Sequence, residues 1–410
     1  MNDKKILVLG CFDTKGVVFE FLLDRLRELG QEVITLNTGV MDADYNFHVD
    51  FTSEAVALAA GDELESLRQL GDRGKAIGVM GKGAAKLVTQ LVAENRIKGA
   101  IGMGGGGGTY MALAAMQGIP LGIPKLCLTT LATKDLSRQI GDKDITLMPS
   151  VVDIAGLNPI IKAFVGQAAA AITGMAQAMV YPIPMLKSIA ISMFGNTTKC
   201  VDRCTELLNE AGYEVYAFHA TGVGGKTMES LIREGCFEAV LDVTTTELAD
   251  NLCGGICSAG PDRLLAAVEM GLPQVVVPGC LDMVNFGHLD TVPLHYRQRQ
   301  LYSWAPDVTL MRTNEEENRM LGKEIVSKLA TSKAPTQIAL PLRGLSQMDD
   351  REGLFHHPAA NRSLFDSIRE GATAKLEVVE VDAHINDARF AEHIVAQLLS
   401  MIEKNRQGQN

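Results

Sequence analysis

The sequence predicts an α/β fold built from two Rossmann-like domains with mostly parallel sheets, internally duplicated, with a ligand cleft between them. Three observations lead to this prediction. Apolar strand-like runs alternate with amphipathic helical patterns, which is typical of parallel sheets covered on both faces. The arrangement that opens the chain recurs in its second half. Glycine-rich segments follow several of the strands, at the sheet edge where such folds bind ligands.

The first element is an apolar strand at residues 5–10, followed by an amphipathic helix at residues 17–29 that ends at Gly30. A second strand at residues 32–36 completes a βαβ unit with short connections. The longer stretch that follows predicts two helices, at residues 51–73 and 74–95.

The second half repeats this order, with a strand at residues 187–193, a helix at 200–210 and a strand at 214–219. Further along, residues 107–127 match residues 260–280 without a gap, including a Gly-Ile-Pro or Gly-Leu-Pro turn before the next strand. The two halves are therefore expected to be related α/β domains.

A helix at residues 158–178 closes the first half, and the stretch Tyr181-Pro-Ile-Pro184 follows it. Proline restricts the backbone and prevents a helix from continuing, so the boundary is expected near residue 182. The predicted domains are residues 1–182 and residues 183–410.

Composition limits the classes of partner. The chain has 410 residues, of which 47% are hydrophobic and 21% charged, and its net charge is −11. Such acidity disfavours nucleic acid or an anionic membrane as the main partner, so we expect a small-molecule ligand. No uninterrupted apolar run reaches membrane-spanning length and no signal-peptide pattern opens the chain, which predicts a cytoplasmic protein. A homo-oligomer is expected.

The most informative motif is the glycine loop, Gly102-Met-Gly-Gly-Gly-Gly-Gly-Thr109, between a predicted strand and a predicted helix. Glycines allow positive φ and close approach of a ligand, and a helix N-terminus attracts anions, so the loop predicts a phosphate or carboxylate cradle. The alternative is a tightly packed turn. The spacing matches neither the Walker pattern nor a full dinucleotide fingerprint.

Other loops are expected to converge on the same edge. Asp13, Thr14 and Lys15 begin the first helix, where amides, a hydroxyl and an ammonium group can bind phosphate, although Asp13 could equally cap the helix. Thr38 follows the second strand at a position suited to contact ribose, or is an ordinary turn residue. Arg73, at a helix boundary, can reach phosphate or stack on a base.

These motifs, together with Phe194-Gly-Asn-Thr-Thr198, Pro278-Gly-Cys-Leu-Asp282 and Arg312-Thr-Asn-Glu-Glu-Glu-Asn318, resemble the Tm-1-like ATP-binding domain family. It is an uncharacterised family of bacterial, fungal and plant proteins, to which the N-terminal region of a tomato tobamovirus-resistance protein belongs. The resemblance covers essentially the whole chain and implies an ATP site in the first domain, with Mg²⁺ held through the nucleotide phosphates. Carried over by position, the ATP contacts are Asp13, Thr14, Lys15, Thr38, Arg73, Gly104, Gly105, Gly106 and Gly107.

The second half is richer in groups that can do chemistry. His219, Asp282 and Arg312 are the candidate catalytic residues, because each follows a predicted strand and should face the crevice. For His219 the alternative is a hydrogen-bonded structural histidine. The segment Gly222-Val-Gly-Gly-Lys-Thr227 predicts a second anion cradle, in which Lys226 binds substrate, and Asn285 is a further candidate substrate contact.

The leading hypothesis is an ATP-binding metabolic enzyme that acts on a small acidic substrate in the cleft between the domains. Two alternatives remain open: a nucleotide-responsive regulatory module without turnover, and a sugar- or acid-handling enzyme that uses no nucleotide. Cysteine and histidine spacings match no zinc pattern, so no protein-bound metal is expected.

Overall fold

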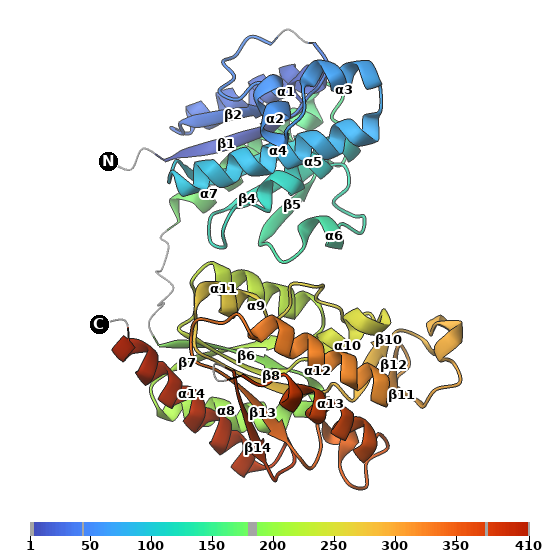
Figure 1. The fold of residues 1–410 in the computed structure, drawn as a ribbon. Coiled ribbons are helices and arrows are strands. Elements are labelled where there is room, and N and C mark those ends of the chain that lie inside the picture. Colours follow the sequence, from blue (N-terminus) through green and yellow to red (C-terminus); the bar gives the residue numbers. More distant parts are fainter. Residues whose placement is uncertain (1–3, 43–44, 179–186, 374–375, 409–410) are drawn as a thin grey trace. The chain divides into compact units, whose positions relative to one another are not determined.

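The structure is a computed structural model that describes residues 4–42, 45–178, 187–373 and 376–408. The chain divides into two compact units, Met1–Tyr181 and Pro182–Asn410 (Figure 1). The proline stretch at 181–184, on which the predicted boundary rests, lies outside the described residues.

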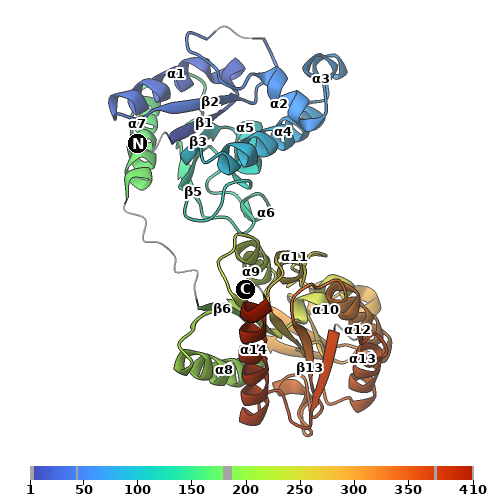
Figure 2. The same cartoon turned by 60° about the vertical axis from the view of Figure 1, so that its left-hand side comes forward.

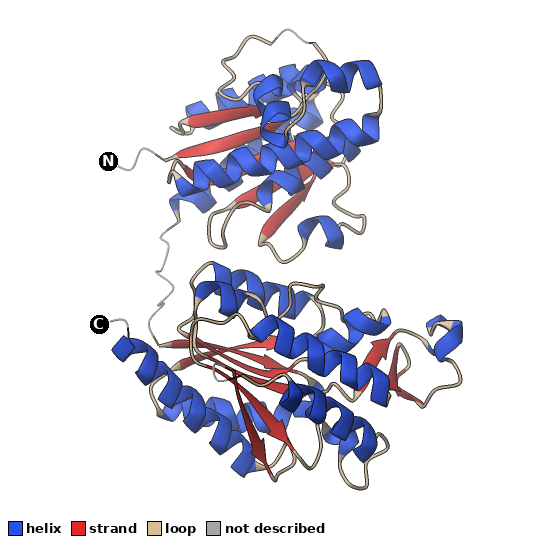
Figure 3. Ribbon diagram, in the orientation of Figure 1, coloured by secondary structure: helices blue, strands red, loops and turns tan. Residues whose placement is uncertain are grey.

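The first unit contains a five-stranded parallel sheet in the order β2-β1-β3-β4-β5, drawn in red in Figure 3. Its strands are β1 (Lys5–Gly10), β2 (Val33–Asn37), β3 (Ile97–Gly104), β4 (Lys125–Thr129) and β5 (Ile145–Pro149). The strand order reverses between β1 and β3. In open parallel sheets the crevice for a ligand lies at the carboxyl ends of the strands at such a reversal.

Helices cover both faces of this sheet (Figures 1 and 2). They are α1 (Phe12–Glu28), α2 (Ser53–Ala60), α3 (Leu64–Leu70), α4 (Arg73–Ala93), α5 (Gly106–Met116), α6 (Ser137–Ile140) and α7 (Pro159–Gln177). Alternate residues of β1 enter two different cores. Ile6 and Val8 pack with α1 and α7, whereas Leu7 and Leu9 pack with α2, α4 and α5. This two-sided burial explains why β1 is a continuous apolar run rather than an alternating one.

The segment predicted as a single helix at residues 51–73 is two helices. Gly61 adopts a left-handed φ of 92° and ends α2, and α3 ends in the same way at Gly71. Asp72 then accepts a hydrogen bond from the Lys75 N–H and begins α4. The glycine C-caps and the aspartate N-cap therefore divide a segment that the apolar pattern alone predicts as one helix.

Among the described residues, α7 is the one helix whose length and composition would suffice to cross a membrane. Lys162 and Gln167 interrupt the apolar residues of α7, so this helix is not an uninterrupted apolar run of that length. A single such helix is weak evidence for a membrane span. Ile161, Val165 and Ile172 are fully buried in the core that α7 shares with β1, β3 and β4, so α7 has the packing of a helix that covers a sheet.

Two glycines of α4 should respond oppositely to alanine. A Cβ on Gly83 would lie 1.9 Å from the Val56 carbonyl oxygen of α2, whereas a Cβ on Gly78 would meet no atom within 4 Å. We expect Gly83→Ala to lower the free energy of unfolding by about 1–3 kcal/mol through overpacking. Gly78→Ala should raise it by up to about 1 kcal/mol through helix propensity. Urea unfolding followed by circular dichroism measures both, and equal effects would contradict this packing of α2 on α4.

The second unit contains a six-stranded parallel sheet in the order β14-β13-β9-β8-β6-β7. Its strands are β6 (Ser188–Met193), β7 (Glu214–His219), β8 (Ala239–Thr244), β9 (Gln274–Gly279), β13 (Thr336–Pro341) and β14 (Leu376–Val381). The first four strands of each unit thus have the same spatial order. This agreement supports the internal duplication that the sequence predicts.

Helices also cover both faces of the second sheet. They are α8 (Thr198–Glu210), α9 (Val223–Arg233), α10 (Thr246–Cys253), α11 (Ala266–Met270), α12 (Glu315–Leu329), α13 (Pro358–Glu370) and α14 (Ala388–Gly408), with short 3₁₀ turns that include η1 (Gly195–Thr197), η2 (Leu289–Thr291), η3 (Leu294–Tyr296) and η4 (Gln347–Asp349).

A small antiparallel sheet was not foreseen from the sequence. Its strands are β10 (Met283–Phe286), β11 (Leu301–Ala305) and β12 (Val308–Arg312), in the order β10-β12-β11. The strand that precedes Arg312 was expected to belong to the parallel sheet, and this expectation was wrong. Arg312 instead pairs with Met283 across two antiparallel strands.

Candidate functional sites

The glycine loop connects β3 directly to α5, as the sequence predicts. Strand β3 ends at Gly104, Gly105 is the N-cap, and no side chain caps the helix. None of the glycines from Gly102 to Gly108 adopts a positive φ, so conformational freedom is not the reason for them. Packing requires two of them. A Cβ on Gly102 would lie 2.7 Å from the Ala112 side chain, and a Cβ on Gly104 would lie 2.8 Å from the Gly108 backbone.

Packing restricts Gly107, where a Cβ would lie 2.9 Å from the Ile77 side chain, but it does not account for Gly105 or Gly106. A Cβ on Gly106 would meet no atom within 4 Å, and one on Gly105 would make only an ordinary contact of 3.8 Å with Thr130. Thr109 is the first residue whose N–H bonds back to the N-cap, at Gly105 O. The N–H groups of residues 106–108 have no acceptor within the helix, so this terminus offers donors beside open space.

Two cationic side chains lie at the same edge of the sheet. A Cβ on Gly107 would be 3.9 Å from a guanidinium nitrogen of Arg73, which places Arg73 against the loop. Lys15 extends along the edge, and its Nζ donates to the Ile154 carbonyl at 2.6 Å, in the segment after β5. The loop after β4 also contacts the glycine loop, since the Thr130 N–H donates a hydrogen bond to the Gly104 carbonyl oxygen. The predicted convergence of these loops is therefore observed.

The side chains of Asp13 and Thr38 form hydrogen bonds within this edge of the sheet. The Asp13 carboxylate accepts hydrogen bonds from the backbone N–H groups of Thr14, Val40 and Met41. It ties the start of α1 to the loop after β2, and Cys11 rather than Asp13 is the N-cap. Thr38 is buried, with its hydroxyl 3.7 Å from the Cys11 sulfur. Thr14 is exposed beside them.

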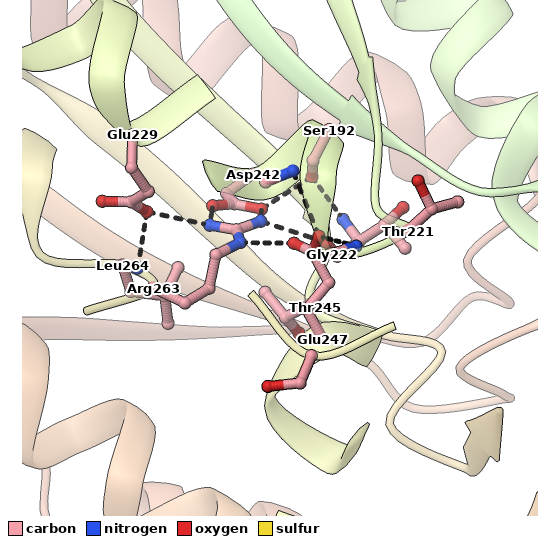
Figure 4. A network of polar contacts seen from close by, with 12 residues as sticks. Ser192, Thr221, Gly222, Glu229, Asp242, Thr245, Glu247, Arg263 and Leu264 are labelled. Atoms are coloured by element: carbon pink, nitrogen blue, oxygen red, sulfur yellow. Dashed lines mark hydrogen bonds and ion pairs between the residues drawn. The ribbon is translucent and has the colours of Figure 1, made fainter. Parts of the chain in front are cut away.

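In the second unit the most prominent polar feature is an ion network around Arg263, which is fully buried (Figure 4). Its guanidinium donates to both carboxylate oxygens of Asp242, a residue of β8, and to Glu247 at 2.6 Å. Glu229 is a third partner at 3.2 Å. Three carboxylates thus surround one buried cation, and burial raises the pKa of both Glu229 and Glu247.

This network fills the second predicted anion cradle. The Glu247 carboxylate accepts from the Gly222 and Gly225 N–H groups at the start of α9. A Cβ on Gly225 would lie 2.0 Å from Glu247, and one on Gly224 would lie 1.8 Å from the His219 carbonyl oxygen. Packing therefore accounts for these glycines, in contrast to Gly106. The side chain of Lys226 is exposed on the first turn of α9.

The matched repeat segments also occupy different positions. In the first unit residue 107 lies in the first turn of α5, the helix that follows β3. In the second unit the helix that follows β8 is α10, which begins at Thr246. Gly260, the aligned partner of residue 107, comes later, in the turn before α11. The topological counterpart of the glycine loop is therefore Thr245-Thr-Glu247, which contains no glycine.

Asp282 and Arg312 lie close together, and both are buried rather than open to a crevice. Arg312 donates to the carbonyl oxygens of Asp282 and Phe355, and its Nη2 bonds Asn361 at 2.7 Å. Asp282 is fully buried and accepts from the Ser346 hydroxyl at 2.7 Å. Burial, with the neighbouring Asp349 carboxylate, raises the pKa of Asp282 to about 7.

The remaining candidates lie elsewhere in the second unit. His219 is exposed at the end of β7, the edge strand of the sheet, whereas Asp282 follows the central strand β9. Asn285 is buried on β10, where its amide donates to Asp250 at 2.8 Å. Burial raises the pKa of Asp250 to about 7.

Arg263 and Glu229 had not been selected from the sequence, because charged residues in a polar turn and a helix carry no local sign of burial.

Comparison with known proteins places the chain in a family. The N-terminal domain model of the "Uncharacterised protein family (UPF0261)" matches residues 4–180, and the C-terminal domain model matches residues 186–402. A UPF0261 protein of Clostridium tetani is 43% identical over 407 residues, covering 98% of this chain and 100% of the relative. UPF0261 protein mlr3387 of Mesorhizobium japonicum is 38% identical, covering 96% and 98%.

The tomato relative is longer. ToMV resistance protein Tm-1(GCR237) of Solanum lycopersicum is 34% identical over 429 residues, which cover 99% of this chain but 57% of the tomato protein. Among solved structures, Os79 from O. sativa covers 96% of this chain and all of its own, with 12% identity and a TM-score of 0.21, too low to inform fold or function. The family resemblance is confirmed: the chain belongs to the UPF0261 family, with the tomato Tm-1 proteins among its homologues.

Proposed function

We propose that this protein binds ATP at the carboxyl edge of the first unit's sheet, with the phosphates at the N-terminus of α5. The observation that carries the proposal is Gly106. Glycine in a helix costs up to about 1 kcal/mol relative to alanine, and no contact at Gly106 requires it. A phosphate oxygen that approaches the N–H groups of this turn does require such open space.

The surroundings suit a nucleotide triphosphate. Arg73 lies against the loop and Lys15 along the same edge, and both are cations that bind phosphate. Asp13 already accepts three backbone N–H groups. A magnesium ion would therefore be held through the phosphates, where it usually keeps most of its water ligands.

The finer proposal is that ATP serves a reaction on a small acid. The support is Asp282, a buried carboxyl group whose pKa near 7 would let it hold or release a proton at neutral pH. Asp282→Asn should abolish turnover of Mg-ATP with such an acid while ATP binding remains. ATP binding without turnover in any metabolite pool would instead support the regulatory module.

The binding proposal is tested by Gly106→Asp. An acidic residue in the first turn stabilises a helix, so the melting temperature should stay constant or rise. The same charge opposes phosphate, so ATP affinity measured by calorimetry should fall on the order of a hundredfold. Stability and binding should thus change in opposite directions.

Two matched variants sharpen this test. Gly106→Asn has nearly the same size without the charge and should weaken ATP binding less than Gly106→Asp. Gly174→Asp adds the same charge on α7, where a Cβ also meets no atom within 4 Å, and should leave binding unchanged. Unaltered ATP affinity in Gly106→Asp, or no ATP binding by the wild type at millimolar concentration, would refute the proposal.

A further inference from the structure

We propose that the second unit holds a separate binding site for a small acid with two or more phosphate or carboxylate groups. The site is a cavity of about 790 Å³ at the carboxyl edge of the second sheet. A volume of this order is typical of small-molecule sites. Its walls belong to the second unit alone, so this proposal does not depend on ATP binding in the first.

The walls come from the loops that follow three parallel strands. Lys199 lies in the first turn of α8, after β6; Arg343 and Arg351 lie in the segment after β13; and His384 and Asn386 follow β14. Loops at the carboxyl ends of parallel strands are where α/β proteins bind ligands. The cavity is therefore placed as a binding site in this class of fold would be.

Strands β6 and β14 are separated in the sheet by β8, β9 and β13, yet their loops meet at the cavity. The reason is that α8 and α14 pack against each other, which brings their N-termini together (Figure 2). Asn386 joins them, since its amide donates to Asn196 O at 3.0 Å and accepts from the Cys200 N–H at 3.3 Å. Two helix N-termini, which favour negative charge, thus lie at one cavity.

The lining of the cavity carries three cations, Lys199, Arg343 and Arg351, and two carboxylates, Asp350 and Asp387. Asp387 accepts from the His384 N–H at 2.8 Å, and Asp350 accepts from the Arg351 N–H. Arg343 forms a bidentate pair with Asp382. In the described part of the chain, Lys199 and Arg351 have no ion-pair partner. The lining side chains thus carry more positive than negative charge in a chain of net charge −11, which favours an anionic ligand.

A neighbouring cavity of about 310 Å³ shares Arg343 and His356 with the first. It adds Arg362, for which the described residues likewise contain no ion-pair partner. The basic surface thus continues beyond the first cavity. A ligand with two anionic groups some distance apart fits this distribution better than a single phosphate or carboxylate.

His384 serves as a wall of the site rather than a free base. Its Nδ1 accepts a hydrogen bond from the Asn386 N–H at 3.1 Å, so the ring proton lies on Nε2. Nε2 is 2.9 Å from the Ser346 carbonyl oxygen, to which it donates. Both ring nitrogens are therefore occupied. The ligand is expected to be held by Lys199 and Arg351, with His384 fixing the loop after β14.

The experiment is calorimetric titration of the full chain with two probes in separate runs. Citrate is the probe for a carboxylate ligand, and pyrophosphate is the probe for a phosphate ligand. The double variant Lys199→Gln/Arg351→Gln removes both uncommitted cations at exposed positions, so the fold should persist. We expect its affinity for the preferred probe to fall about tenfold or more, because charge-assisted hydrogen bonds are lost.

The matched control is Lys333→Gln/Lys404→Gln, which removes two exposed cations away from the cavity, before β13 and near the end of α14. It should bind both probes like the wild type.

Tighter citrate binding identifies a polycarboxylate ligand, and tighter pyrophosphate binding a phosphorylated one. Gly106→Asp should leave this site intact, which separates it from the ATP site. No binding of either probe at about 10 mM, or equal losses in both double variants, would overturn the proposal.

Discussion

Arg263→Met is expected to lower the free energy of unfolding of the second unit by about 3–5 kcal/mol at pH 7, the usual cost of leaving a buried charge without its partner. Arg263 is fully buried between Asp242, Glu247 and Glu229, so its loss leaves three carboxylates together in the core. Methionine has a similar volume, which keeps the cavity term small. Urea unfolding followed by the fluorescence of Trp304, the only tryptophan, reports on this unit.

The deficit should shrink as the pH is lowered. Without the guanidinium the carboxylates hold protons more tightly in the folded than in the unfolded chain, so acid favours the folded variant. Arg203→Met is the control, because Arg203 pairs with Glu206 and Glu392 on the surface and should change the unfolding midpoint little. A loss as small as that of the control, or one that does not depend on pH, would show that Arg263 does not neutralise these acids.

Replacing Asp282 by asparagine is expected to flatten the pH dependence of stability. Burial raises the pKa of Asp282 to about 7 from its ordinary value of 3.8. Between about pH 4 and pH 7 the folded chain therefore binds a proton that the unfolded chain has released. Stability due to this group is fully present below the unfolded pKa and is lost as the pH rises, at about 1.4 kcal/mol per pH unit.

The comparison is made between wild type and Asp282→Asn at several pH values from about 5 to 8, again through Trp304. Asparagine retains an oxygen for the Ser346 hydroxyl but no charge, so the difference in unfolding free energy should grow up to about pH 7 and then level off. Asp262→Asn, at an exposed position, serves as the control and should leave the slope unchanged. Parallel curves for wild type and Asp282→Asn would mean that Asp282 is ionised across this range.

Much of the fold could be predicted because its signals are local. The βαβ pattern at residues 5–36, the recurrence at residues 187–219 and the strand–glycine–helix junction at residue 104 all correspond to elements of the structure. Errors arose where short polar signals compete with apolar periodicity. Gly61 divides one predicted helix, and the strand before Arg312 belongs to an antiparallel sheet, a choice that depends on pairing with the distant β10.

The sequence by itself determined the two α/β units, the family and the position of the glycine loop, since these depend on residue order and periodicity. Only the tertiary structure decided which glycine-rich helix start is open. Gly106 and Gly225 look alike in sequence, but Glu247, in the first turn of α10, occupies the turn at Gly225. At Gly106, a Cβ would meet no atom of the described residues within 4 Å. Long-range packing makes that distinction, because it places a carboxylate at the N-terminus of α9 and none at Gly106 at the start of α5.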